Sequence, residues 1–434
     1  MTETDTIHAL ASGAGTCGVS VLRVSGPRAE AVLTALTGRA LPEPRRAVLR
    51  VLRDAAGQVI DRALVLRFAA GASFTGEPVV ELHLHGSPAV RRAAMDAVAA
   101  AGPSRLAEPG EFTLRAFLNG RMDLAEAEAL ADLLAAETEA QHRQAARALD
   151  GSLHRRVEGW RTALIEAAAL VEVTIDWADE EVPEDVSPEV AILLGRVAEE
   201  IASELAAFEG AQKLRNGLEV AILGAPNAGK SSLLNALAGR EAAIVAAVPG
   251  TTRDVLELRY DLDGLPVTFL DTAGLRETGD AVEQIGVDRA RARAEAADLR
   301  LILDAPDAPA GPELAALARE GDLRVASKAD LVAGAGLAVS AATGQGIEAL
   351  LAAVSAALAP RVSGEGLVAH ERQRAALAAG QAALAAAMEG LDCRGAEEVS
   401  EDIRAAMRAL ERLTGRIGVE DVLGAVFGRF CLGK

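Results

Sequence analysis

Cysteine and long apolar segments are scarce in this chain of 434 residues, and each shortage excludes a class of protein. The three cysteines, Cys17, Cys393 and Cys431, are an odd number without the spacing of a metal site, which fits a reducing cytoplasm. The N-terminus lacks the basic start and apolar core of a secretory signal. Uncharged runs such as residues 375–388 are too short and too rich in alanine, glycine and glutamine to span a bilayer. We therefore expect a cytoplasmic protein without membrane attachment.

Positive charge is also scarce. The chain has 44 lysines and arginines against 63 aspartates and glutamates, a formal net charge of -19 at pH 7. This charge argues against broad, non-specific binding of polyanions, and any contact with nucleic acid should be focal or shared with a partner. The remaining composition, 50% apolar and 25% charged, is that of a globular protein of two to three domains.

A phosphate-binding loop is predicted at residues 224–231, which read G-A-P-N-A-G-K-S. An apolar run precedes the loop and a helical pattern follows it, which is the context that this motif requires. Gly224 and Gly229 let successive N–H groups turn toward phosphate oxygens. Lys230 neutralises the charge of the β- and γ-phosphates, and the Ser231 hydroxyl can hold Mg²⁺.

Two motifs that sense the γ-phosphate are predicted next, at the spacing of a small GTPase. In the first, Thr251-Thr-Arg-Asp254, the hydroxyl of Thr252 is offered to Mg²⁺. In the second, Asp271-Thr-Ala-Gly274, the carboxylate can hold Mg²⁺ through water while the Gly274 N–H reaches the γ-phosphate.

Two further motifs lie where a nucleotide base would bind, Ser327-Lys-Ala-Asp330 and Ser340-Ala-Ala342. Asp330 is suited to accept two hydrogen bonds from the N1 and N2 edge of guanine, which adenine cannot donate, so guanine is preferred. The base motif normally begins with asparagine. Ser327 is shorter and lacks the amide, so we expect it to need water to reach the same groups and to weaken nucleotide affinity by about 0.5–1.5 kcal/mol.

The residue that orients the attacking water is not evident from the motifs alone. Ras-like enzymes place a glutamine directly after the second phosphate-sensing motif, but this chain has Leu275, which can polarise nothing. Glu277 and Glu283 lie downstream, and either carboxylate could accept a hydrogen bond from water.

The rest of the chain predicts a multidomain fold. Residues 1–119 form a small α+β domain, in which Glu81, His83 and His85 alternate onto one strand face that lines a pocket or is merely solvated. Residues 120–215 and 364–434 are two parts of an all-α helical domain, and residues 216–363 are an α/β Ras-like domain inserted between them. The expected strands are residues 18–24, 47–53, 59–68 and 79–84, and the expected helices are residues 27–36, 88–101, 124–149, 153–174, 187–215, 370–390, 397–413 and 419–427.

Two charged stretches of the helical segment leave alternatives open. Residues 176–185 are acidic and are either a solvated loop or a metal site. A group of arginines is either an RNA-facing surface or a set of ordinary exposed helix charges. This group consists of Arg143, Arg147, Arg155, Arg156 and Arg161.

Taken together, these residues resemble the MnmE (TrmE) family of tRNA modification GTPases, along essentially the whole chain. The nucleotide motifs that carry the resemblance are residues 224–232, 249–254 and 271–276. Outside them, the similar stretches are residues 5–7, 21–26, 74–77, 109–112, 115–120 and the ending F-C-L-G-K at 430–434.

The resemblance implies a potassium-stimulated GTPase whose two G domains meet across a homodimer. Potassium would take the place of the arginine finger of other GTPases and stabilise charge on the phosphates. The side chain of Asn227 and the main chain of the loop at Ala246, Val248 and Thr251 would be its ligands. By the same alignment Glu283 would orient the attacking water.

The resemblance also implies that the first domain dimerises and holds 5-formyl- or methylene-tetrahydrofolate on Arg23, Glu81, Arg121 and Lys434. With an FAD-containing partner like MnmG (GidA), in a heterotetramer or larger complex, the family adds an aminomethyl or carboxymethylaminomethyl group to C5 of the wobble uridine of tRNA. Cys431 is either catalytic or a neighbour of the site. The alternative is a regulatory GTPase switch without one-carbon chemistry.

The residues expected to contact GTP are Asn227, Ala228, Gly229, Lys230, Ser231, Ser232, Ala246, Thr251, Thr252, Asp271, Thr272, Ala273, Gly274, Ser327, Lys328, Asp330, Ser340 and Ala341.

Overall fold

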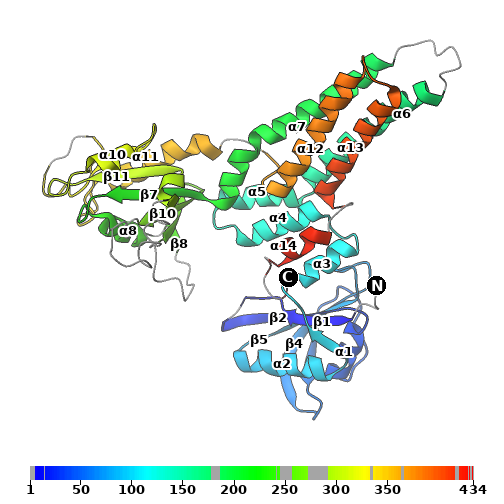
Figure 1. Cartoon of the computed structure of the whole chain (residues 1–434). Helices are drawn as coiled ribbons and strands as arrows, with labels where there is room; N and C mark the ends of the chain where they lie inside the picture. The colour runs from blue at the N-terminus through cyan, green and yellow to red at the C-terminus, as the bar shows by residue number, and fades with distance from the viewer. Residues whose placement is uncertain are drawn as a thin grey trace, which may run out of the picture. The chain divides into compact units, whose positions relative to one another are not determined.

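The protein is represented by a computed structural model, in which two compact units are present. The N-terminal unit consists of Met1–Ala131 and Glu411–Lys434, and the central unit of Asp132–Leu410 (Figure 1). The residues that the structure describes are 5–13, 15–176, 186–240, 242–244, 257–271, 292–332, 336–362, 366–415, 420–428, 430 and 433.

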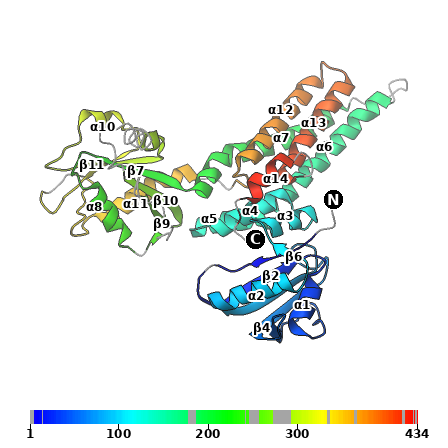
Figure 2. The ribbon, with the colours of Figure 1, turned by 60° about the horizontal axis from the view of Figure 1, so that its bottom comes forward.

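The N-terminal unit is built on a six-stranded sheet with the order β3-β4-β5-β2-β1-β6. Helices α1 (Ala29–Thr37) and α2 (Pro88–Ala100) pack their apolar residues on one face of this sheet (Figure 2). On the other face, Ile7 and Ala9 pack against Phe112 of α3 (Glu111–Leu118). The strands are β1 (Thr6–Leu10), β2 (Cys17–Ser25), β3 (Val48–Arg53), β4 (Val59–Phe68), β5 (Val79–Gly86) and β6 (Ser104–Leu106).

Two helices from distant parts of the sequence complete the N-terminal unit. The first residues of α4 (Leu124–Ala135) share a small core with α14 (Glu420–Phe427) and Phe430. The rings of Phe427 and Phe430 stack with centroids 6.1 Å apart. The terminal stretch of the chain is therefore anchored in the N-terminal unit.

The strand patterns predicted for β2 to β5 are confirmed to within two residues, but β1, β6 and α3 were not predicted. β1 is almost wholly buried, so it lacks the alternation that marks a half-exposed strand, and β6 has three residues. The single helix predicted over residues 124–149 is wrong. The chain breaks it into α4 and α5 (Glu139–Leu149), because Thr138 leaves the helix and forms a capping box with Gln141.

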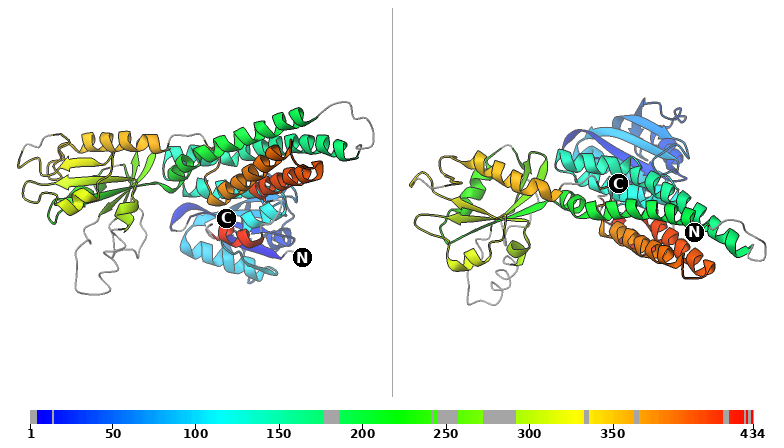
Figure 3. Two further views of the ribbon diagram at one scale, coloured as in Figure 1. Left: turned by 45° about the horizontal axis from the view of Figure 1, so that its top comes forward. Right: turned by 90° about the horizontal axis from the view of Figure 1, so that it is seen from above.

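The helical part of the central unit consists of long antiparallel neighbours. The predicted spans of α6 (Ser152–Asp176), α7 (Ser187–Asn216) and α12 (Glu371–Gly390) are confirmed, as is that of α13 (Ala396–Thr414). These four helices run side by side in Figures 1 and 3. No helix in the described ranges is both long enough and apolar enough to cross a membrane.

A doubly wound α/β sheet lies between α7 and α12 in the sequence, as predicted. Its strand order is β12-β11-β7-β10-β9-β8, and β7 (Leu218–Gly224) runs parallel to both of its neighbours. One face is covered by α8 (Lys230–Ala238) and α11 (Ile347–Leu358), and the other by residues 294–297 and α10 (Pro312–Ala316). The remaining strands are β8 (Ala243–Ile244), β9 (Glu257–Leu262), β10 (Leu265–Asp271), β11 (Leu299–Asp304) and β12 (Leu323–Ala326).

Asp132 contacts both segments that connect the long helices to this sheet, the end of α7 and the residue before α12. Arg215, at the end of α7, donates from Nε to Asp132 Oδ1 at 2.8 Å. His370, directly before α12, places Nε2 2.7 Å from Asp132 Oδ2. Burial alone would raise the pKa of Asp132, but the hydrogen bond and charge of His370 and the charge of Arg215 lower it. The carboxylate therefore stays ionised and holds both segments.

Candidate functional site

The predicted phosphate loop leaves the carboxyl end of the central strand β7 and leads into α8. At Gly224 a Cβ atom would lie 3.1 Å from the Ala228 Cβ and 3.2 Å from the Leu303 Cβ, so any larger residue at the start of the loop would crowd both neighbours. Asn227 and Gly229 have left-handed backbones, with φ of 63° and 95°. These two bends turn the loop back on itself before α8 starts.

The charged and hydroxyl groups of the loop meet the end of the neighbouring strand. Lys230 Nζ donates to the carbonyl oxygens of Gly224 at 2.8 Å and Ala225 at 3.1 Å. Ser231 Oγ donates to Asp271 Oδ2 at 2.7 Å. Asp271 ends β10, which pairs in parallel with β7, and it is buried. The sequence-predicted hydroxyl and carboxylate are thus brought together at one edge of the sheet.

The two predicted base motifs also come together. The backbone N–H of Ala329 donates to the Val339 carbonyl at 3.0 Å, and this joins the 327–330 motif to the 340–342 motif. Ser327 is buried, and its Oγ donates directly to the Ala228 carbonyl of the phosphate loop at 2.7 Å. No water is needed for that contact. Asp330 is exposed, as an acceptor for a ligand must be.

Several predicted site residues lie outside the described residues. Among the nucleotide-contacting and potassium-binding residues these are Ala246, Val248, Thr251, Thr252, Thr272, Ala273 and Gly274. Among the rest they are Glu283, Cys431 and Lys434.

The N-terminal unit brings two of the predicted site residues into direct contact. Arg23 and Glu81 face each other across β2 and β5, and Arg23 Nε donates to Glu81 Oε1 at 3.0 Å. The guanidinium lies 5.7 Å from the ring centroid of Phe74 and 5.5 Å from that of Phe112. Both distances are within cation–π range. The sequence patterns gave no role to either ring, because each comes from a motif far from Arg23 in the chain.

Arg121 and Gly433 each lie close to another segment of the N-terminal unit. A Cβ atom at Gly76 would lie 3.3 Å from Arg121 Cγ, so Arg121 packs against the loop that carries Phe74. A Cβ atom at Gly433 would lie 1.8 Å from the Leu10 carbonyl oxygen, so Gly433 lies against β1. Arg121 is thus placed beside the 69–78 loop and Gly433 beside β1.

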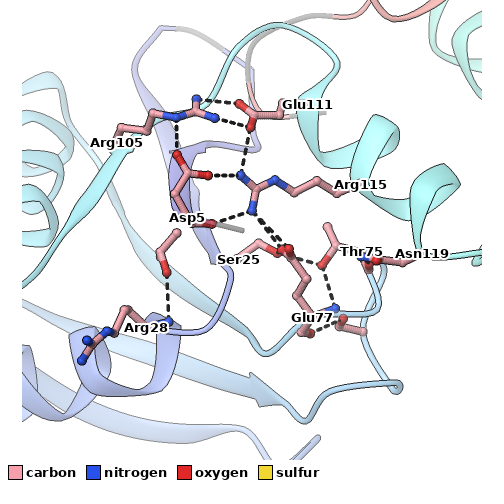
Figure 4. A network of polar contacts seen from close by, with 11 residues as sticks. Asp5, Ser25, Arg28, Thr75, Glu77, Arg105, Glu111, Arg115 and Asn119 are labelled. Carbon is pink, nitrogen blue, oxygen red and sulfur yellow. Dashed lines mark hydrogen bonds and ion pairs between the residues drawn. The ribbon is translucent and has the colours of Figure 1, made fainter. Parts of the chain in front are cut away.

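A buried polar network supports the loop that carries Phe74 (Figure 4). At its centre, Arg115 of α3 contacts Glu77 at 3.1 Å, Glu111 at 3.0 Å and Asp5 at 2.6 Å. Ser25 of β2 donates to Glu77 at 2.6 Å, which ties the network to the sheet. Since Glu77 follows Phe74 by three residues, the network fixes the loop from both the helix side and the sheet side.

Replacing Arg115 by methionine is expected to lower the free energy of unfolding of the N-terminal unit by about 3–5 kcal/mol, because it leaves Glu77 and Glu111 buried without their shared cation. Native-state hydrogen exchange of the backbone amides of β1 and α3 measures the free energy of unfolding of the N-terminal unit separately from that of the central unit. The control is Arg46→Met, which removes an exposed partner of Glu43 and should cost no more than about 1 kcal/mol. Equal effects of the two variants would contradict the role of Arg115.

The same network predicts a loss of stability in acid. Burial alone would raise the pKa of Glu111, but hydrogen bonds from Arg105 and Arg115 lower it below its ordinary value of 4.5. A carboxylate with a lowered pKa stabilises the fold above its unfolded-state pKa, and this stability is lost as the pH falls through the folded-state pKa. Hydrogen-exchange protection should therefore fall below about pH 4.5 in the native chain and less steeply in Arg115→Met.

Three of the five arginines of the helical segment pair with carboxylates. Arg143 pairs with Glu139 at 2.7 Å, and Arg155 pairs with Asp150 at 3.3 Å. Arg156 pairs with Glu204 of α7. Such pairs are typical of exposed helix charges. Within the described ranges there is also no cluster of three or more histidine, cysteine, aspartate or glutamate side chains that could hold a metal ion.

Models of two protein families match the chain and between them span nearly all of it. The model described as the MnmE helical domain matches residues 124–431. The model described as the N-terminus of the GTP-binding protein TrmE matches residues 6–121.

Curated relatives match over their full length. The tRNA modification GTPase MnmE of Roseobacter denitrificans is 52% identical over 433 residues, which cover 99% of this chain and 100% of the relative. The protein of the same name from Dinoroseobacter shibae is 54% identical over 440 residues, with the same coverage. Among solved structures, the G domain of the T. maritima FeoB iron transporter is 23% identical with a TM-score of 0.26, and the match covers 32% of this chain and 98% of that one. That likeness is too slight to bear on function.

Proposed function

The chain belongs to the MnmE (TrmE) family of tRNA modification GTPases, and on that premise we propose that it uses GTP hydrolysis to drive modification of C5 of the wobble uridine of tRNA. The group added is aminomethyl or carboxymethylaminomethyl, built with a one-carbon unit of tetrahydrofolate. The observation that supports GTP hydrolysis by this chain is the contact of 2.7 Å between the Ser231 hydroxyl and the Asp271 carboxylate beside the phosphate loop.

The donor chemistry at this contact fits Mg²⁺, which prefers hard oxygen ligands. Ser231 and Thr252 would bind the ion through their hydroxyls, and Asp271 would bind it through water. The ion supplies positive charge to the β- and γ-phosphates. Lys230, which now contacts two loop carbonyls, would turn to the same phosphates, and Asp330 would accept the guanine edge.

Potassium fits the exposed, left-handed turn at Asn227, where the side-chain amide oxygen is a neutral oxygen ligand. Asn227 would bind the ion together with the main chain at Ala246, Val248 and Thr251. The ion supplies the charge that an arginine finger supplies in other GTPases. Glu283 would accept a hydrogen bond from the attacking water and so orient it.

The N-terminal unit would hold 5-formyl- or methylene-tetrahydrofolate. Arg23 and Glu81 lie beside the partly exposed ring of Phe74, which offers a flat apolar face to a pterin. Arg121 and Lys434 would meet the negative charges of the folate tail, and Cys431 would lie close to the bound one-carbon unit. The one-carbon unit is the group that the reaction consumes.

The family resemblance also supports a homodimer formed through the N-terminal unit and a complex with an FAD-containing, MnmG-like partner in the cytoplasm. The FAD of this partner would supply the redox chemistry of the reaction. The chain has a net charge of -19, and three of the five arginines of its helical segment are paired with carboxylates. We infer from this that the partner makes most of the contacts with the tRNA phosphates.

The proposal is tested by nucleoside analysis of tRNA from cells that lack the gene. The modified wobble uridine should disappear and return with the wild-type gene, but not with Arg23→Met. The control, Arg50→Met, changes an arginine of the edge strand β3 and should restore the nucleoside fully. Unaltered tRNA in the deletion strain would leave a regulatory GTPase switch as the better explanation.

A further inference from the structure

Lys328 of the base motif is held by an aspartate to which the sequence patterns gave no role. Lys328 Nζ lies 2.7 Å from Oδ1 and 2.6 Å from Oδ2 of Asp307, so the carboxylate grips the ammonium with both oxygens. Asp307 lies in a tight turn after β11, closed by mutual backbone hydrogen bonds between Ala305 and Ala308. The side chain of Lys328 is 26% exposed and that of Asp307 is 61% exposed.

Both ends of this ion pair are anchored to the same rigid frame. The turn that carries Asp307 begins at Asp304, whose carbonyl accepts the Ser327 N–H at 2.9 Å. Lys328 itself has a left-handed backbone, with φ of 55°. The four-carbon stem of Lys328 therefore spans a fixed gap between the base motif and the 304–308 turn, two residues away from the exposed Asp330.

Ser327 makes the neighbouring lysine more important. A serine hydroxyl has one proton, and Ser327 donates it to the Ala228 carbonyl of the phosphate loop. An asparagine amide has two N–H donors and can serve the loop and a ligand together. In this chain the base must therefore be held mainly by Asp330 and by the stem of Lys328.

We propose that Asp307 is a positioning residue for the guanine nucleotide. By holding the ammonium of Lys328, it keeps the lysine stem extended along the base site, so that the nucleotide binds without having to order a flexible side chain. This inference rests on the proposed guanine nucleotide site and adds to it a residue outside the nucleotide motifs.

The test is the affinity of the full-length chain for GDP and GTP with Asp307→Asn and Asp307→Glu. Asp307→Asn should weaken both nucleotides by the same factor, about 5- to 10-fold, because the change acts at the base end and not at the phosphates. It should raise KM for GTP and leave kcat unchanged. Asp307→Glu keeps the carboxylate and should restore most of the affinity.

Two further variants separate positioning from general electrostatics. In Lys328→Met the additional change Asp307→Asn should have no effect, since the two residues act as one unit. The matched control is Asp263→Asn, which removes the same charge from the exposed turn between β9 and β10 and should leave both affinities unchanged. Because Asp307 is exposed, its replacement should not disturb folding.

Unchanged or tighter binding of nucleotide by Asp307→Asn would overturn the proposal. Tighter binding would mean that the ion pair between Lys328 and Asp307 has to break before the nucleotide binds. A wild-type chain that binds no guanine nucleotide would instead refute the nucleotide site itself. The two failures are therefore distinguishable in one titration series.

Discussion

Replacing Glu283 by alanine is expected to slow GTP hydrolysis by about 10²–10⁴-fold and to leave the affinities for GTP and GDP unchanged. The position after the second phosphate-sensing motif is Leu275, which cannot polarise water. Another group must then orient the water, and the family resemblance implies that this group is Glu283. Single-turnover hydrolysis of bound GTP measures the chemical step without interference from product release.

The control for this prediction is Glu277→Ala, the other carboxylate that follows the motif. Its rate should stay within a few-fold of the wild type. If Glu283→Ala kept its turnover while Glu277→Ala lost it, the roles of the two carboxylates would have to be exchanged. Both residues lie outside the described residues, so the prediction rests on the sequence.

Replacing Asn227 by glycine should abolish the stimulation of GTP hydrolysis by potassium and lower the rate in potassium by about 10²-fold. Asn227 has a φ of 63°, which glycine adopts without strain, so the variant removes the amide oxygen and keeps the shape of the loop. The measurement compares initial rates in potassium chloride and sodium chloride at equal ionic strength. The sodium rate should be the same for wild type and variant.

Asn235→Ala is the matched control, because it removes an exposed amide from α8, the helix that follows the loop. It should retain full potassium stimulation. A wild-type chain that hydrolyses GTP equally fast in both salts would remove potassium from the proposed mechanism. A stimulated Asn227→Gly chain would remove only Asn227 from the set of ligands.

The parts of the fold that were predictable are those with a local signal. The phosphate loop, β7 and α8 follow from one motif and its flanks, and β4 follows from its alternating residues. The break between α4 and α5 was missed because the apolar stripe continues past Thr138, and the competing signal is a single capping residue. β1 was missed because full burial removes the alternation of a half-exposed strand.

The candidate sites divide in the same way. Ser231 and Asp271 were predicted to act together, and their contact follows from two parallel strands that end at one edge. The contacts of Phe74 and Phe112 with Arg23 depend on three distant segments, and no spacing rule connects them. The grip of Asp307 on Lys328 was equally invisible, because it depends on how a short turn packs against a motif 20 residues later.

Asp132 connects the two segments that join the inserted sheet to the helices. The inserted sheet is joined to the helices by two chain segments, and two unconnected segments can move independently of each other. Here the Asp132 carboxylate contacts Arg215 in the segment before the sheet and His370 in the segment after it, so the two segments are coupled. We therefore expect a displacement of the sheet to reach the long helices through both connections together.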